Sequence, residues 1–168
     1  MDTVQYEYRT GIGTDIHQLV PKRPLMLGGC EVPYELGLLG HSDGDVVLHA
    51  VMDAVLGACG DGDIGMLFPD TDPQWQDADS KDLTLRVREK MKKDHWEIVN
   101  IDVIIHAQAP KLGSYKGQMK RAIAGLLDAD FARVNIKAKT NEGLDAVGQG
   151  HAIAATVVVL LRRRIKGI

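Results

Sequence analysis

Residues 152–161 read AIAATVVVLL, and this β-branched apolar run decides the fold because it is typical of a strand buried in a sheet. Working back along the chain, residues 133–139 and 97–106 also predict strands. Residues 115–127 and 80–93 carry apolar side chains at helical spacing and predict helices. Because strands and helices alternate through this half of the chain, we expect an α/β (α+β) fold with helices packed on a mixed β-sheet.

The N-terminal part predicts a strand followed by a hairpin. Residues 5–17 contain β-favouring side chains and then Gly11 and Gly13, which predicts a strand that bends as it ends. The short apolar runs 24–27 and 30–33 flank a Gly-Gly pair, which predicts a hairpin.

A helix is predicted over residues 43–60 because valine and alanine recur there on one face. Asp43 or Ser42 is expected to cap its start, and Gly60 its end. The acids, glycines and prolines of residues 61–79 predict a loop.

The composition describes one compact domain, residues 1–168. The chain is 45% hydrophobic with a formal net charge of −3, so it has no general attraction to nucleic acid or to anionic lipid. No apolar run is long enough to cross a bilayer, and neither a signal nor a transit peptide is evident. Cys30 and Cys59 predict small core residues in a reducing compartment, and residues 162–164 with Lys166 predict a solvated tail. We expect a cytoplasmic bacterial protein, or one inside an organelle if a transit peptide has been removed, without nucleic-acid or membrane partners.

Three side chains suggest a metal site. Asp15 and His17 are two apart in a predicted strand and so point to the same face, while Ile16 should point into the core. His49 lies inside the predicted helix, where a histidine is as often a core residue as a ligand. Together they form a two-histidine, one-carboxylate set suited to zinc with one open coordination position. Asp45, one turn before His49, is expected either to orient its imidazole or to cap the helix.

Three further segments combine polar groups with loop signals. Residues 62–73 hold carboxylates and glycines that suit sugar hydroxyls, although a solvated acidic turn is the simpler interpretation. Residues 107–111 follow a strand and offer a proline-stiffened backbone to a base edge. Residues 139–142 also follow a strand, where Thr140 and Glu142 suit a phosphate and a hard cation such as magnesium. The histidines at positions 95 and 106 show no partner spacing.

These pieces resemble the 2-C-methyl-D-erythritol 2,4-cyclodiphosphate synthase family. The matching strings are GTDIH at 13–17, HSDGDVVLH at 41–49, GDIG at 62–65, FPDTDP at 68–73, AQAPK at 107–111 and KTNE at 139–142. The resemblance implies a homotrimer in which helices cover one face of each sheet and the sheets face the threefold axis. It also implies that the active site lies between neighbouring subunits.

The resemblance assigns roles to individual residues. It implies one zinc ion per subunit on Asp15, His17 and His49, magnesium or manganese on Glu142, and catalytic roles for His41 and Thr140. It also implies a set of substrate contacts, which are Asp15, His17, His41, Ser42, Asp63, Ile64, Gly65, Phe68, Pro69, Asp70, Thr71, Asp72, Ala107, Gln108, Ala109, Pro110, Lys111, Leu112, Gly113, Lys139, Thr140, Asn141 and Glu142.

The implied reaction converts 4-diphosphocytidyl-2-C-methyl-D-erythritol 2-phosphate to the 2,4-cyclodiphosphate and CMP, in non-mevalonate isoprenoid biosynthesis. A zinc-dependent nucleotide or phosphoester hydrolase and a non-catalytic trimeric ligand-binding protein are the alternatives.

The chain departs from the family pattern after the KTNE segment. Many members carry a phenylalanine and an arginine there, lining a cavity on the threefold axis that holds an isoprenoid diphosphate. Ala146 and Gln149 occupy those two positions, followed by His151. Because an aromatic surface and a fixed positive charge are missing, we expect weak binding of geranyl or farnesyl diphosphate at neutral pH.

Overall fold

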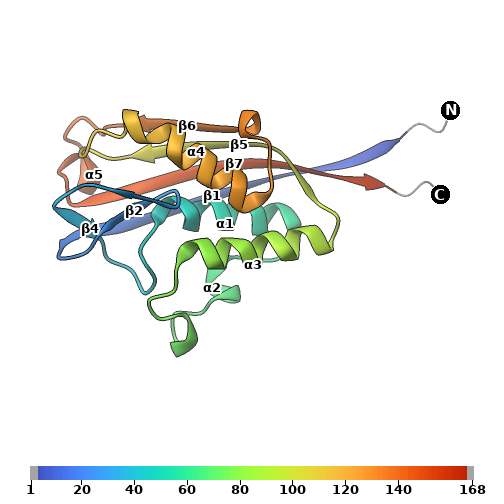
Figure 1. The fold of residues 1–168 in the computed structure, drawn as a ribbon, viewed down its shortest axis with the longest axis horizontal. Coiled ribbons are helices and arrows are strands. Elements are labelled where there is room, and N and C mark those ends of the chain that lie inside the picture. The colour runs from blue at the N-terminus through green and yellow to red at the C-terminus, as the bar shows by residue number, and fades with distance from the viewer. Residues whose placement is uncertain (1–3, 166–168) are drawn as a thin grey trace.

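The computed structural model describes residues 4–165 and is built on a five-stranded sheet in the order β4-β1-β7-β5-β6 (Figure 1). β5 and β6 are parallel, whereas the other neighbouring strands are antiparallel, so the predicted mixed sheet is confirmed. A separate hairpin pairs β2 with β3. The strands are β1 (Gln5–Pro21), β2 (Leu25–Leu27), β3 (Cys30–Val32), β4 (Leu36–Leu38), β5 (Glu97–His106), β6 (Val134–Lys139) and β7 (Ala152–Ile165).

The helices gather on one side of this sheet (Figure 1). α1 packs on β1 and β7, α4 packs on β6, and α3 lies across α1 and α4. The helices are α1 (Val46–Cys59), α2 (Ile64–Leu67), α3 (Ser80–Lys93), α4 (Lys116–Leu127) and α5 (Asp145–Gly148). Within residues 4–165, no helix has the length and hydrophobicity that a membrane crossing requires.

The two faces of the sheet differ in what covers them. Val157 and Val159 of β7 are fully buried under the helices, whereas Val158 between them is 45% exposed. On β1, Ile12 and Ile16 share this open face and are 67% and 57% exposed. The prediction that Ile16 points into the core is therefore wrong, because the helices cover the face of β1 opposite to it.

Gly11 and Gly13 lie on the covered face of β1, and the prediction that they bend the end of the strand is wrong. The strand continues to Pro21. A Cβ atom at Gly11 would lie 1.9 Å from the carbonyl oxygen of Ala54, and one at Gly13 would lie 2.0 Å from that of Ala50. The glycines are there because the backbone of α1 rests directly on the backbone of β1.

α1 begins after Asp45, so neither Asp43 nor Ser42 is its cap. The Asp45 carboxylate accepts hydrogen bonds from the amides of Val47 and Leu48, which satisfies the first turn of the helix. It also accepts from the amides of Gly28 and Gly29, at 2.8 and 2.7 Å, in the predicted hairpin turn. Asp45 thus joins the hairpin to the helix that carries His49.

The predicted solvated tail at residues 162–164 belongs to β7. Arg162 pairs with Glu97 at 2.6 Å and Arg163 with Glu7 at 2.8 Å, and Arg163 also stacks on Trp96. Carboxylates and an aromatic ring on neighbouring elements hold these arginines, which extends the strand beyond its apolar run. Lys166 lies outside the described residues.

Several short elements were not predicted because they are too short to show a period. β4 and α5 are among them, and the predicted loop over residues 61–79 contains α2 and a 3₁₀ turn at Pro73–Trp75. Another 3₁₀ turn, Gly113–Tyr115, precedes α4. Cys30 and Cys59 are free thiols that lie half-buried at the edge of the core, and burial raises the pKa of Cys59 to about 11.

Candidate metal centre and the pocket around it

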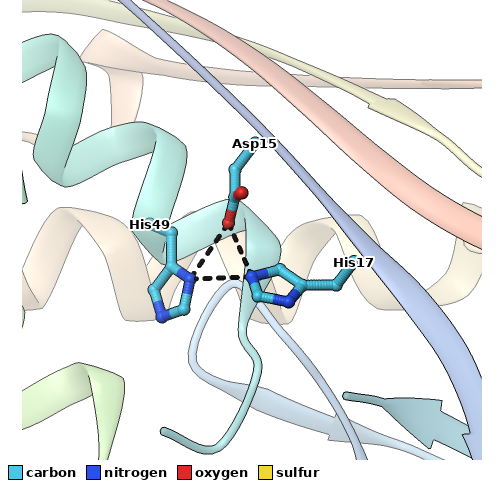
Figure 2. Close-up of side chains that lie close together, drawn as sticks. All are labelled: Asp15, His17 and His49. Carbon is cyan, nitrogen blue, oxygen red and sulfur yellow. Dashed lines mark hydrogen bonds and ion pairs between the residues drawn. The ribbon is translucent and has the colours of Figure 1, made fainter. Parts of the chain in front are cut away.

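Asp15, His17 and His49 converge as the sequence predicted (Figure 2). Asp15 and His17 project from the covered face of β1 and meet His49, the fourth residue of α1. The Oδ2 atom of Asp15 lies 2.8 Å from Nε2 of His17 and 3.0 Å from Nδ1 of His49. The two ring nitrogens are 3.2 Å apart. One oxygen and two nitrogens therefore form a nearly regular triangle.

The outer nitrogen of His17 fixes how this ring can bind a cation. Its Nδ1 atom lies 2.5 Å from the carbonyl oxygen of Leu39, which can only accept a hydrogen bond. Nδ1 must then carry a proton, and Nε2 is the nitrogen whose lone pair is available inside the triangle.

The outer nitrogen of His49 does not face Asp45, so the prediction that Asp45 orients this imidazole is wrong. Capping and the hairpin use the whole Asp45 carboxylate instead. Nε2 of His49 faces the hydroxyls of Ser42 and Ser80, each at 3.0 Å.

The triangle fits a tetrahedral cation. Ligand bonds of about 2.0–2.1 Å give tetrahedral edges of roughly 3.3 Å, close to the three distances observed. Three electron-pair donors turned toward one point repel each other unless a positive charge lies between them. Three protein ligands also leave a fourth position free, which is the pattern of a catalytic rather than a structural site.

The electrostatics of the metal-free triad agree with this geometry. Burial opposes ionisation of Asp15, but hydrogen bonds from His17 and His49 outweigh it and hold the pKa of Asp15 well below its usual range. Burial likewise opposes a charge on His17, yet its bond to Asp15 raises the pKa of His17 overall. A proton on His17 therefore occupies the place that a metal cation would take.

A pocket of about 390 Å³ opens from the triad. Phe68 and Trp75 form one wall, with ring centroids 5.0 Å apart in an edge-to-face arrangement. Its lining residues are Asp15, His17, His41, Ser42, His49, Met52, Ile64, Gly65, Phe68, Asp70, Trp75 and Leu83. The sequence did not point to Met52, Trp75 or Leu83, because apolar residues in helices and turns carry no chemical signal.

Two hydrogen bonds hold loops against this pocket. The guanidinium of Arg23 donates to the carbonyl oxygen of Ser42 at 2.7 Å and so fixes the segment that carries His41. The carboxylate of Asp53, one turn beyond His49 on α1, accepts from the amide of Ile64 at 2.8 Å. Burial raises the pKa of Asp53. The start of α2 is thereby tied to the helix that carries a candidate metal ligand.

A second cavity, of about 260 Å³, lies where β5 and β6 end. It shares no lining residue with the first. It gathers most of the predicted residues of the two loops that follow these strands, together with Lys116 and Ala138, which were not predicted. Its lining residues are Ala107, Gln108, Pro110, Lys111, Leu112, Gly113, Lys116, Ala138, Lys139 and Thr140. A single chain therefore places His41 and Thr140 in different cavities.

The remaining predicted contacts line neither cavity. Asp63 and Asp72 accept hydrogen bonds from backbone amides of their own turns, as acids in loops commonly do. Asn141 pairs with Nδ1 of His106 at 2.9 Å, a contact that the spacing in the sequence did not reveal. The other residues outside both cavities are Pro69, Thr71, Ala109 and Glu142.

Glu142 is exposed and has a positive φ of 51°. A glutamate in this left-handed region is uncommon, and the loop presents its side chain beyond the end of β6. Its role as a metal ligand stays a prediction. Ala146, Gln149 and His151 are also exposed, and the weak isoprenoid binding expected from them stays a prediction.

The YgbB family matches residues 8–162. A 2-C-methyl-D-erythritol 2,4-cyclodiphosphate synthase from Geobacillus kaustophilus is 53% identical over 156 residues, covering 93% of this chain and 99% of that protein. One from Bordetella petrii is 54% identical over 156 residues, covering 93% and 96%. A solved IspF–CDP complex from Plasmodium falciparum is 32% identical with a TM-score of 0.83, covering 94% and 97%.

The chain belongs to the YgbB family. The resemblance read from the sequence is confirmed, and with it the function that it implied, that of a cyclodiphosphate-forming lyase of isoprenoid biosynthesis.

Proposed function

We propose that the pocket around Asp15, His17 and His49 is where this chain converts 4-diphosphocytidyl-2-C-methyl-D-erythritol 2-phosphate into the 2,4-cyclodiphosphate and CMP. The observation that carries this proposal is the triangle of three electron-pair donors, with edges of 2.8–3.2 Å, at the base of a pocket of about 390 Å³. Such a site holds a cation against a phosphate, which is what ring closure between two anionic groups requires.

The triad suits zinc, because two imidazole nitrogens and one carboxylate oxygen are ligands that zinc prefers. The exposed carboxylate of Glu142 suits magnesium or manganese arriving with the substrate's phosphates. Bound there, the two cations supply positive charge that offsets repulsion between the reacting phosphates.

The protein's own task is to bend the substrate. An oxygen of the 2-phosphate attacks the β-phosphorus of the cytidine diphosphate arm, the bond from that phosphorus to the bridging oxygen breaks, and CMP leaves with the electron pair. No protein nucleophile is needed. His41, Gly65 and Asp70 line the pocket where they can contact the phosphates, the ribose and the methylerythritol hydroxyls. Ser42 also lines it, although its hydroxyl is already bonded to His49.

We also propose that the second cavity receives the cytosine and belongs to the active site of a neighbouring subunit. Thr140 lines this cavity and not the pocket around Asp15, His17 and His49, which we call the metal pocket. One chain therefore does not bring together His41 and Thr140, the two residues predicted to be catalytic. The open face of the sheet, with Ile12, Ile16 and Val158 exposed, supports a trimer whose sheets face the threefold axis.

A zinc hydrolase is the second candidate, because the open coordination position equally suits water. The product distinguishes the two reactions. We expect purified protein incubated with the cytidylated substrate, zinc and magnesium to release CMP and the cyclic diphosphate in equal amounts. A linear phosphate product would favour the hydrolase, and no turnover would leave only a ligand-binding role.

A further inference from the structure

The far side of the His49 ring is enclosed by hydroxyl groups. Its Nε2 atom lies 3.0 Å from Oγ of Ser42 and 3.0 Å from Oγ of Ser80. Ser80 is fully buried, and Ser42 and His49 are only 7% and 8% exposed. Water therefore contributes little to the hydrogen bonding of this nitrogen, and the two serines decide whether it carries a proton.

Asp43 sets the direction of the hydrogen bonds. Its carboxylate accepts both from Oγ of Ser80, at 2.5 Å, and from the Ser80 amide, at 3.0 Å. Because the Ser80 hydroxyl gives its only proton to Asp43, its oxygen can only accept from Nε2 of His49. Nε2 must then carry the ring proton, which leaves the lone pair on Nδ1, the atom that faces Asp15 and His17.

We infer that Asp43 and Ser80 are positioning residues of the metal centre. They act through His49, holding its imidazole in the Nε2–H form and at the angle that directs Nδ1 to the cation. Among the described residues, neither Asp43 nor Ser80 makes a hydrogen bond to Asp15 or His17. Carboxylate groups behind metal-bound histidines act in the same way, here with a serine hydroxyl between the carboxylate and the ring.

The three residues of this hydrogen-bonded chain come from separate segments of the sequence. Asp43 precedes α1, His49 lies within it, and Ser80 opens α3. The bond from Asp43 to the Ser80 amide also fastens the start of α3 to the segment before α1. The metal centre therefore extends to a third element, and a change at Ser80 should be felt by the metal although Ser80 is no ligand.

This inference rests on the proposed function only in taking the triad to bind zinc. The test compares Ser80→Ala with Thr84→Ala. Thr84 is one turn further along α3 and equally buried, and its hydroxyl donates to the Ser80 carbonyl oxygen at 2.7 Å without touching His49. Each variant loses one buried hydroxyl from the same helix, but only Ser80→Ala breaks the link between Asp43 and His49.

We expect Ser80→Ala to bind zinc about 10- to 100-fold more weakly in competition with a chromophoric chelator. Thr84→Ala should stay within about 3-fold of the wild type, and the two variants should lose similar stability without metal. In the zinc-loaded wild type, the ¹⁵N resonances of His49 should show a protonated Nε2.

Equal zinc affinity in the two variants, or a His49 Nε2 that carries no proton in the zinc-loaded protein, would overturn the inference while leaving the proposed metal centre standing. A wild type that fails to bind one zinc per chain would instead overturn both.

Discussion

The pocket around the triad and the cavity at the ends of β5 and β6 are built differently. In the metal pocket, Asp15, His17, His49 and Ser42 are all bonded to other groups before any ligand arrives. In the second cavity, none of the lining side chains makes a hydrogen bond to another described residue. Its loops are joined instead through the backbone, where the amide of Ala107 donates to the carbonyl oxygen of Lys139 at 2.9 Å.

This difference agrees with the separate roles proposed for the two regions. Ligands that are held in place beforehand bind a cation more tightly, and one chain supplies and positions all three proposed zinc ligands. The lysine and glutamine side chains of the second cavity make no hydrogen bond to another described residue, which suits the proposed role of a surface that a ligand and a neighbouring subunit complete.

Removing one ligand should abolish activity. In His49→Ala the triad loses one of its three donors, and we expect zinc content to fall to near zero and turnover to fall at least about 1,000-fold. The circular dichroism spectrum should change little, because α1 keeps its cap at Asp45. Elemental analysis gives the zinc content, and full occupancy in this variant would exclude the triad as the metal site.

Mixing two inactive variants should restore activity if the two cavities meet between subunits. His49→Ala lacks the metal ligand and Thr140→Ala lacks the second cavity's threonine. In randomly assembled trimers about one quarter of the sites pair an intact metal pocket with an intact second cavity. Co-expression of both variants should therefore recover about a quarter of wild-type turnover. Activity no higher than that of either variant alone would place the whole site within one chain.

Changing the contact between α1 and β1 should affect the metal pocket through the backbone. A methyl group in Gly13→Ala meets the Ala50 carbonyl oxygen at 2.0 Å, so we expect about 3 kcal/mol or more of destabilisation and weaker zinc binding. Gly125→Ala is the control, since its added methyl contacts nothing within 4 Å in the last turn of α4. It should stabilise the protein by about 0.5–1 kcal/mol in urea unfolding. Equal effects of the two changes would show that the close contact is unimportant.

The smallest expected effect is a dependence of zinc binding on pH. Hydrogen bonding to Asp15 raises the pKa of His17 above its ordinary value of 6.5, despite burial. Without metal, the ion pair between protonated His17 and ionised Asp15 therefore stabilises the folded state below pH 6.5. This contribution to the free energy of unfolding is lost as the pH rises through the pKa of His17 in the folded state. Zinc must displace that proton. The rise in melting temperature on adding zinc should thus grow from acidic to alkaline pH and level off above the pKa of His17, and a constant rise would contradict this.

The convergence of Asp15, His17 and His49 was predicted because each residue type and its local spacing carried a signal. Asp15 and His17 are two apart in a strand, and His49 lies in a helix with a clear apolar period. The hydrogen bond between Ser80 and His49 was missed, because 31 residues separate the two and nothing in the spacing joins them. The part of Asp43, which acts through Ser80, was missed with it. Contacts between elements that are far apart in the sequence depend on how those elements pack, and the spacing of residues in a single sequence does not show this.

The prediction for Ile16 failed for an instructive reason. Isoleucine in a strand ordinarily marks the buried face. On β1, however, the covered face carries Gly11 and Gly13, because α1 approaches too closely for larger side chains. The apolar residues are left on the open face, so the usual pattern is inverted where the helix and strand backbones are in contact.

The cap of α1 has a consequence for the chemistry of phosphate. The amino-terminal end of a helix carries a partial positive charge and free amides, and many proteins use it to bind a phosphate group. Here Asp45 is fully buried at that end and accepts hydrogen bonds from two of its amides, so the position is occupied by the protein's own anion. The N-terminus of α1 is therefore not free to bind a phosphate, and under the proposed function other groups, among them bound cations and the lysines of the second cavity, balance the charge of the diphosphate substrate.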